Sequence, residues 1–165
     1  MGLSNLARSQ IFAGTFAGLQ RDLYFRLLGG VSAVAGMTVN DDGTLPGALS
    51  EVTTPQLVLG TRWANPVVGT PTTIQVPKAG GANIIFANSG ATWANVCAYA
   101  ITTDANPISP TNYVAGDPLT FFNPATNTYQ VGAQSVVSGK SIVFDPVTNP
   151  IVERLGNPGP VTNPT

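Results

Sequence analysis

The segment TWANVCAYAIT, residues 92–102, alternates along its length like a β-strand with two apolar faces. One face is interrupted at Asn95 and provides the candidate core residues Trp93, Cys97, Tyr99 and Ile101. The other face carries smaller apolar side chains, namely Ala94, Val96, Ala98 and Ala100. Two apolar faces are typical of a strand that is covered on both sides. Alternatively, the face of small residues is where another subunit approaches.

Further strand segments precede this one and are separated by turn signals. Residues 72–76 (TTIQV) alternate as a short strand, and residues 83–87 (NIIFA) predict another. Residues 21–28 (RDLYFRLL) alternate over a longer run that ends at a Gly-Gly pair. Weaker strand signals lie between them, at residues 49–52, 56–59 and 61–63. The intervening prolines and glycines mark turns.

Shorter strand segments follow residues 92–102. Residues 104–118 contain three prolines and predict a loop. Residues 134–137 and 141–144 are joined by Ser-Gly-Lys, which predicts a hairpin. The other strand segments predicted here are 119–122 and 128–131, which flank an Asn-Pro turn, and 151–155.

About eight short strands joined by turns predict an all-β fold, specifically a single jelly-roll-like β-sandwich. The predicted sandwich domain covers residues 21–155. Residues 1–20 predict an N-terminal arm or a short helix, because apolar residues recur there at a rough 3–4 spacing after a candidate N-cap. Residues 156–165, with three prolines and two glycines, predict an extended C-terminal tail.

The composition is poor in charge, since only 9% of the 165 residues are charged, against about 25% in an ordinary soluble domain. The chain has no histidine, so a Ser-His-Asp or Cys-His catalytic unit is impossible and metal ligands are few. The single cysteine, Cys97, excludes an internal disulfide. We therefore expect a protein that is not an enzyme and that binds no cofactor and no metal.

Charge and hydropathy also restrict the partners. With a net charge of −1 and no basic patch, the sequence predicts no binding to nucleic acid. The nearest approach to a membrane span, residues 29–39, is short and broken by glycine, so no membrane partner is expected. A surface with little charge is weakly protected against association, which favours packing against protein neighbours.

Six residues are candidates for an assembly interface. Phe12 and Phe16 lie four residues apart in the N-terminal arm, either as a helix face against the domain or as an arm docked into a neighbour. Arginine suits bidentate, partly buried pairing. Trp63 is either a core residue or a contact anchor, because tryptophan is enriched at contact hot spots. The complete set is Arg8, Phe12, Phe16, Arg21, Arg26 and Trp63.

Several motifs together carry a family resemblance. They are ANIIFANSGATWANVCAYAITTD (82–104), VVSGKSIVF (136–144) and IVERLG (151–156), preceded by LSNLARSQIFAG (3–14) and DLYFRLLGG (22–30). In this pattern the chain resembles a group of small virion structural proteins of tailed bacteriophages, described as head decoration (cement) proteins or small tail-fibre-like proteins. The resemblance implies a β-sandwich, no catalysis and symmetric assembly on a virion.

From this resemblance we expect a capsid decoration or cement protein that stabilises the head shell by binding across major capsid subunits. The expected partners are the major capsid protein and further copies of this chain in a symmetric homo-oligomer. The expected location is the capsid surface of the virion, after synthesis in the host cytoplasm. Two alternatives stay open. One is a tail or neck adaptor or a fibre-base subunit, and the other is a carbohydrate- or receptor-binding β-sandwich module that uses Trp63, Tyr113 and Tyr129.

Overall fold

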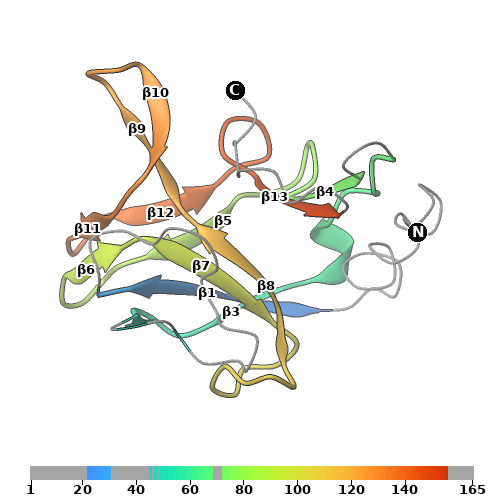
Figure 1. Cartoon of the computed structure of the whole chain (residues 1–165), viewed down its shortest axis with the longest axis horizontal. Coiled ribbons are helices and arrows are strands. Elements are labelled where there is room, and N and C mark those ends of the chain that lie inside the picture. The colour runs from blue at the N-terminus through green and yellow to red at the C-terminus, as the bar shows by residue number, and fades with distance from the viewer. Residues whose placement is uncertain (1–21, 31–44, 46, 48, 69–71, 156–165) are drawn as a thin grey trace. The chain divides into compact units, whose positions relative to one another are not determined.

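The computed structural model describes residues 22–30, 45, 47, 49–68 and 72–155. Within these residues the chain is all-β, and the regular structure besides strands is one 3₁₀ turn, Gly60–Arg62. The strands are β1 (Leu23–Gly29), β2 (Ser50–Glu51), β3 (Gln56–Val58), β4 (Thr72–Val76), β5 (Ile84–Ala87), β6 (Trp93–Val96), β7 (Ala98–Thr102), β8 (Tyr113–Pro118), β9 (Thr120–Asn123), β10 (Thr128–Val131), β11 (Gln134–Val136), β12 (Ser141–Phe144) and β13 (Ile151–Leu155) (Figure 1). The predicted arm at 1–20 and tail at 156–165 lie outside the described residues, together with Arg8, Phe12, Phe16 and Arg21.

The described residues divide into two compact units, each built from separated stretches of the chain. Unit 1 contains residues 22–23, 58–68, 72–85 and 143–155. Unit 2 contains residues 24–30, 45, 47, 49–57 and 86–142. Each unit therefore depends on contacts between segments that are distant in the sequence.

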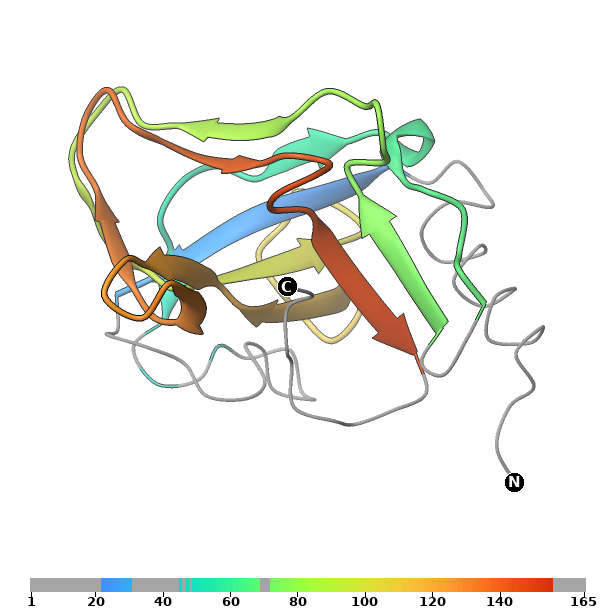
Figure 2. The same cartoon turned by 90° about the horizontal axis from the view of Figure 1, so that it is seen from above.

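Unit 1 contains the antiparallel pair of β4 and β13 (Figure 2), in which Ile151 lies opposite Val76 and Glu153 lies opposite Ile74. Burial alternates along β4, as the sequence of residues 72–76 predicts for a strand with one buried face. Trp63, a residue of this unit, is buried in the chain, with 4% of its surface exposed.

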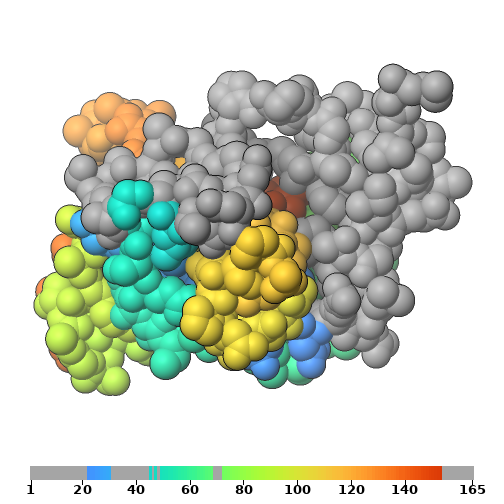
Figure 3. Space-filling view, turned by 60° about the horizontal axis from the view of Figure 1, so that its bottom comes forward, coloured from blue at the N-terminus to red at the C-terminus, as the bar shows by residue number. Residues whose placement is uncertain are grey.

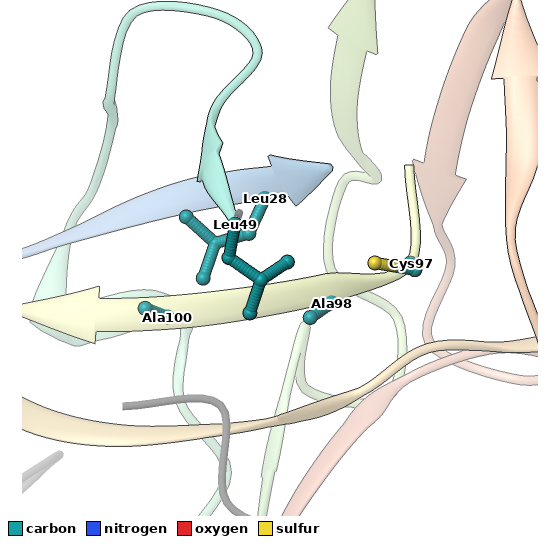
Figure 4. Packing of buried hydrophobic residues seen from close by; sticks show 5 residues of the cluster. All are labelled: Leu28, Leu49, Cys97, Ala98 and Ala100. Atoms are coloured by element: carbon teal, nitrogen blue, oxygen red, sulfur yellow. The ribbon is translucent and has the colours of Figure 1, made fainter. Parts of the chain in front are cut away.

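Unit 2 contains a sheet with the strand order β2-β1-β7-β8, and β3 also pairs with β1. β7 lies between two antiparallel neighbours, and its Ala100 is opposite Arg26 of β1. All residues of β7 are buried, so the predicted covering of both faces is confirmed for this strand. The small side chains of Ala98 and Ala100 pack with Leu28 and Leu49 of the same chain (Figure 4).

The predicted strand 92–102 is two strands, β6 and β7, separated at Cys97. The prediction of one continuous strand is wrong because the strand ends before Cys97 and a new strand begins after it. Asn95, with a φ of 48°, lies within β6, whose pairing with β11 is irregular. The chain also changes partners here, since β6 pairs with β11 whereas β7 pairs with β1 and β8. Of the candidate core residues, Cys97, Tyr99 and Ile101 are buried, and Trp93 is half-buried.

The predicted hairpin of residues 134–137 and 141–144 is also wrong. The two segments are strands joined by a turn, but β11 pairs with β6 and β12 pairs with β5. The buried side chain of Asn88 contributes to this arrangement, because its Nδ2 donates to the Val136 carbonyl at 2.6 Å and to the Ala91 carbonyl at 2.9 Å. The end of β11 is thereby tied to the turn that follows β5.

Two further segments differ from the prediction. Part of the predicted loop 104–118 is strand β8. Pro107 and Pro110 precede this strand and Pro118 ends it, and at such positions the missing N–H is tolerated. The weak strand signal at 61–63 is a 3₁₀ turn instead, in which Arg62 N–H donates to the Leu59 carbonyl at 2.9 Å. The side chain of Asp22 accepts a hydrogen bond from Gly60 N–H at 3.2 Å and so fixes the start of this turn.

Candidate interaction surface

The structure places the two described members of the candidate interface set in the interior. Arg26 is 1% exposed and Trp63 is 4% exposed, so neither side chain is available on the surface of the chain. Their assignment to an interface is therefore corrected. The burial of Trp63 also removes it from the expected sugar-binding platform, in which Tyr113 is half-buried and Tyr129 is exposed.

Arg26 lies on β1 and directs its guanidinium group toward acceptors within unit 2. Its Nε donates to Thr102 Oγ1 at 2.9 Å, and its Nη2 donates to the backbone carbonyls of Asp104, at 3.0 Å, and Asn106. Its Nη1 forms an ion pair with Glu51 of β2, whose side chain keeps 30% exposure. A buried charge is tolerated when it is paired and hydrogen-bonded in this way, so Arg26 has a structural role.

The loop that follows β7 is held by a second polar side chain, that of the buried Asn112. Its Nδ2 donates to Asp104 Oδ1 at 2.9 Å and to the Pro107 carbonyl at 3.0 Å, and its Oδ1 accepts from Ser109 N–H at 2.9 Å. The hydrogen bond from Asn112 is also the largest cause that lowers the pKa of the Asp104 carboxyl. Arg26 and Asn112 therefore fix this loop together.

A cavity of about 620 Å³ lies beside this loop in unit 2. Its walls come from segments near residues 50 and 110, which lie side by side in the space-filling view (Figure 3). The described lining is mainly apolar and includes Leu45, Leu49, Pro107 and Ile108. Arg26 and Glu51 also line the cavity, but they pair with each other. This lining suits an apolar group and supplies little charge for anchoring a ligand.

The hairpin of β9 and β10 projects away from the sheet of β1, β7 and β8 (Figure 1). Its register puts Phe122 opposite Tyr129 and Thr120 opposite Val131, so these four side chains share one face. The rings of Phe122 and Tyr129 meet edge to face, with centroids 5.5 Å apart. Phe122 is 51%, Tyr129 50% and Val131 47% exposed. This face of the hairpin therefore presents a pair of aromatic rings and a valine to solvent.

The other face of the hairpin is largely polar and forms its own hydrogen bonds. Asn123 Nδ2 donates to Gln130 Oε1 at 3.1 Å, and Gln130 Nε2 donates to Thr126 Oγ1 at 3.2 Å. The turn uses Asn127 with a φ of 53°, a conformation that asparagine adopts more readily than most residues. These bonds order the turn and leave the apolar face available for contact with another surface.

The hairpin also lies in a stretch without charge. No charged residue occurs between Asp117 and Lys140, and the stretch exposes four large apolar side chains: Phe122, Tyr129, Val131 and Val137. Exposed apolar surface with little charge is typical of protein contact sites. The sequence predicted strands at 119–122 and 128–131, on either side of an Asn-Pro turn, but did not indicate which side chains are exposed. The uncharged run was the sequence signal that could have pointed to this surface.

Among the described residues, no group of three or more His, Cys, Asp or Glu side chains could hold a metal ion. In the same part of the chain, no helix is long and apolar enough to cross a membrane. Comparisons of the chain with protein-family models, with curated proteins and with solved structures gave no match.

Proposed function

We propose that this chain is a structural protein of a phage virion, which decorates the capsid and stabilises the head shell by binding across major capsid subunits. In this proposal the chain is a jelly-roll-like β-sandwich, has no catalytic activity and assembles symmetrically with copies of itself. The observation that carries the proposal is the exposed, uncharged aromatic face of the β9–β10 hairpin. The resemblance of residues 82–155 to small virion proteins of tailed phages supplies the expected partner.

The physical basis is burial of apolar surface at a low desolvation cost. Phe122, Tyr129 and Val131 are half exposed, and the residues around them in the hairpin are uncharged, so contact with a partner desolvates no ionised group there. Aromatic side chains supply large contact areas, and tyrosine is frequent among the residues that dominate binding energies. A single contact of this size is weak, but many copies on one lattice bind with avidity.

The proposal can be tested with virus particles that lack this chain. We expect them to release their DNA at a lower temperature and after a milder osmotic shock than complete particles, and added purified chain should restore their resistance. The Phe122→Ser/Tyr129→Ser double variant should fail to restore it. Val147→Ser is the matched control, because Val147 is an 82% exposed residue of unit 1 and its variant should act like wild type. Unchanged resistance in particles without the chain contradicts the proposal.

Two alternatives use the same surface. A tail or neck adaptor would occur in far fewer copies than a protein bound to the capsid lattice, so the copy number separates these locations. An exposed tyrosine also suits stacking against a sugar ring. The carbohydrate-binding module would be favoured if the wild-type chain binds on a glycan array, Tyr129→Ala loses this binding and Val147→Ala keeps it.

A further inference from the structure

The outer edge of β10 has no strand partner among the described residues, because β10 pairs with β9 alone. All residues of β10 are exposed. An open strand edge is a template for another strand, and natural proteins protect such edges with charged residues, proline or bulges. β10 has the sequence TYQV, without charge or proline, and its register with β9 is uninterrupted. This edge is therefore unprotected against pairing.

We propose that the outer edge of β10 pairs with the same edge of a second copy of this chain, antiparallel about a two-fold axis at Gln130. The inference deepens the proposed function, on which it rests, by naming a second copy of the chain as a direct partner of the hairpin. An antiparallel pair of identical strands satisfies two-fold symmetry, so each copy offers the same surface to the other.

The two faces of the hairpin restrict the register, and an axis at Gln130 is one that joins the apolar faces. With Gln130 opposite Gln130 of the other copy, Tyr129 lies opposite Val131. Directly opposite side chains share a face of a sheet, so this register joins the apolar faces of both hairpins on one side. A shift by one residue would put the apolar face of one copy beside the polar face of the other.

The absence of charge favours a second copy as the partner. Two copies meet at this edge without like-charge repulsion, because no charged residue lies between Asp117 and Lys140. The same absence gives the edge no means of selecting a charged partner strand. A two-stranded ribbon is marginally stable in water, and pairing makes a four-stranded sheet from two such ribbons. The joined apolar face of this sheet stays available for the capsid.

Sedimentation equilibrium of the purified full chain tests the pairing. We expect wild-type protein to form dimers or multiples of dimers. Val131→Lys should weaken the association constant by about tenfold or more, because a lysine on an edge strand opposes pairing. Val147→Lys is the control and should associate like wild type. Circular dichroism verifies that both variants are folded, so a loss of association can be assigned to the edge.

Disulfide formation tests the register. In a Gln130→Cys variant the introduced thiols face each other across the axis, and oxidised glutathione should convert them to an intermolecular disulfide. The Val147→Cys control should stay monomeric on non-reducing gels. Cys97 does not interfere, because it is completely buried.

Three results would overturn the inference: a wild-type chain that is monomeric at all concentrations, dimers that are unchanged in Val131→Lys, or a monomer whose hairpin binds only the major capsid protein. The measurements use no virus particles. Failure of the pairing is therefore distinguishable from failure of the chain to join a virion.

Discussion

Glu51 of β2 is the carboxylate partner of the buried Arg26 of β1, although the two residues lie 25 positions apart in the sequence. This pair holds β2, a two-residue edge strand, to the sheet. The same guanidinium also holds the loop after β7, because it donates to the carbonyls of Asp104 and Asn106. One side chain therefore connects three separated segments of unit 2.

Removal of Arg26 is expected to be strongly destabilising. Arg26→Ala leaves Glu51 and the acceptors in the loop without their donor, and we expect a loss of about 3–5 kcal/mol in the free energy of unfolding. Glu51→Gln should cost less, about 1–3 kcal/mol, because the amide oxygen still accepts a hydrogen bond although the buried guanidinium loses its counter-charge. Urea unfolding measures both variants. Equal, small losses would show that the pair does not hold these segments.

We expect Asp104 to make the free energy of unfolding depend on pH in the acid range. Its pKa is lowered from 3.8 chiefly by the side-chain hydrogen bond from Asn112. A carboxyl whose pKa is lower in the folded than in the unfolded chain stabilises the fold at pH values above its pKa in the unfolded chain. This contribution is lost as the pH falls through its pKa in the folded chain. Asp104→Asn should therefore lower stability more at neutral pH than in strong acid.

The same hydrogen bond can be tested at the atomic level. In Asn112→Ala, the pKa of Asp104 should rise toward 3.8, as followed by the carboxyl carbon shift in an NMR titration. A wild-type Asp104 that titrates at or above 3.8 would contradict this account of the loop.

Gly29 marks a close approach of two backbone segments. A Cβ at this position would lie 2.7 Å from the Ala94 carbonyl oxygen and 2.8 Å from Val52 Cγ1. Because the backbone carbonyl cannot move aside alone, Gly29→Ala should cost about 1–3 kcal/mol. Gly90→Ala is the control, since a Cβ there meets no atom within 4 Å. Thermal unfolding compares them, and equal midpoints would argue against the close approach.

Several strands of the fold were predicted from the sequence, and β4 was predicted from alternation. β4, β5 and β13 lie within the predicted segments 72–76, 83–87 and 151–155, and burial alternates along β4 and β5. In such strands the period of two in the side chains is set locally, so a single sequence is enough to find them.

Strand partners and breaks were not predictable in the same way. A change of strand partners at Cys97 divides one alternating run into two strands, and the side chain of Asn88 ties β11 to a turn rather than to β12. The burial of Arg26, a candidate interface residue, was not predictable because its acceptors are distant in the sequence. The exposure of Phe122 and Tyr129 likewise depends on a projecting hairpin, which alternation does not reveal.

In the proposed function, the β9–β10 hairpin attaches this chain to a capsid lattice. Quantitative mass spectrometry of purified particles, with copies counted against the major capsid protein, tests it most directly. We predict that wild-type chain and Val147→Ser are present in a simple ratio to capsid subunits, and that Phe122→Ser/Tyr129→Ser falls about tenfold or more, as expected when contact hot spots are removed. Absence of the wild-type chain from particles, or an unchanged copy number in the double variant, would contradict the claim.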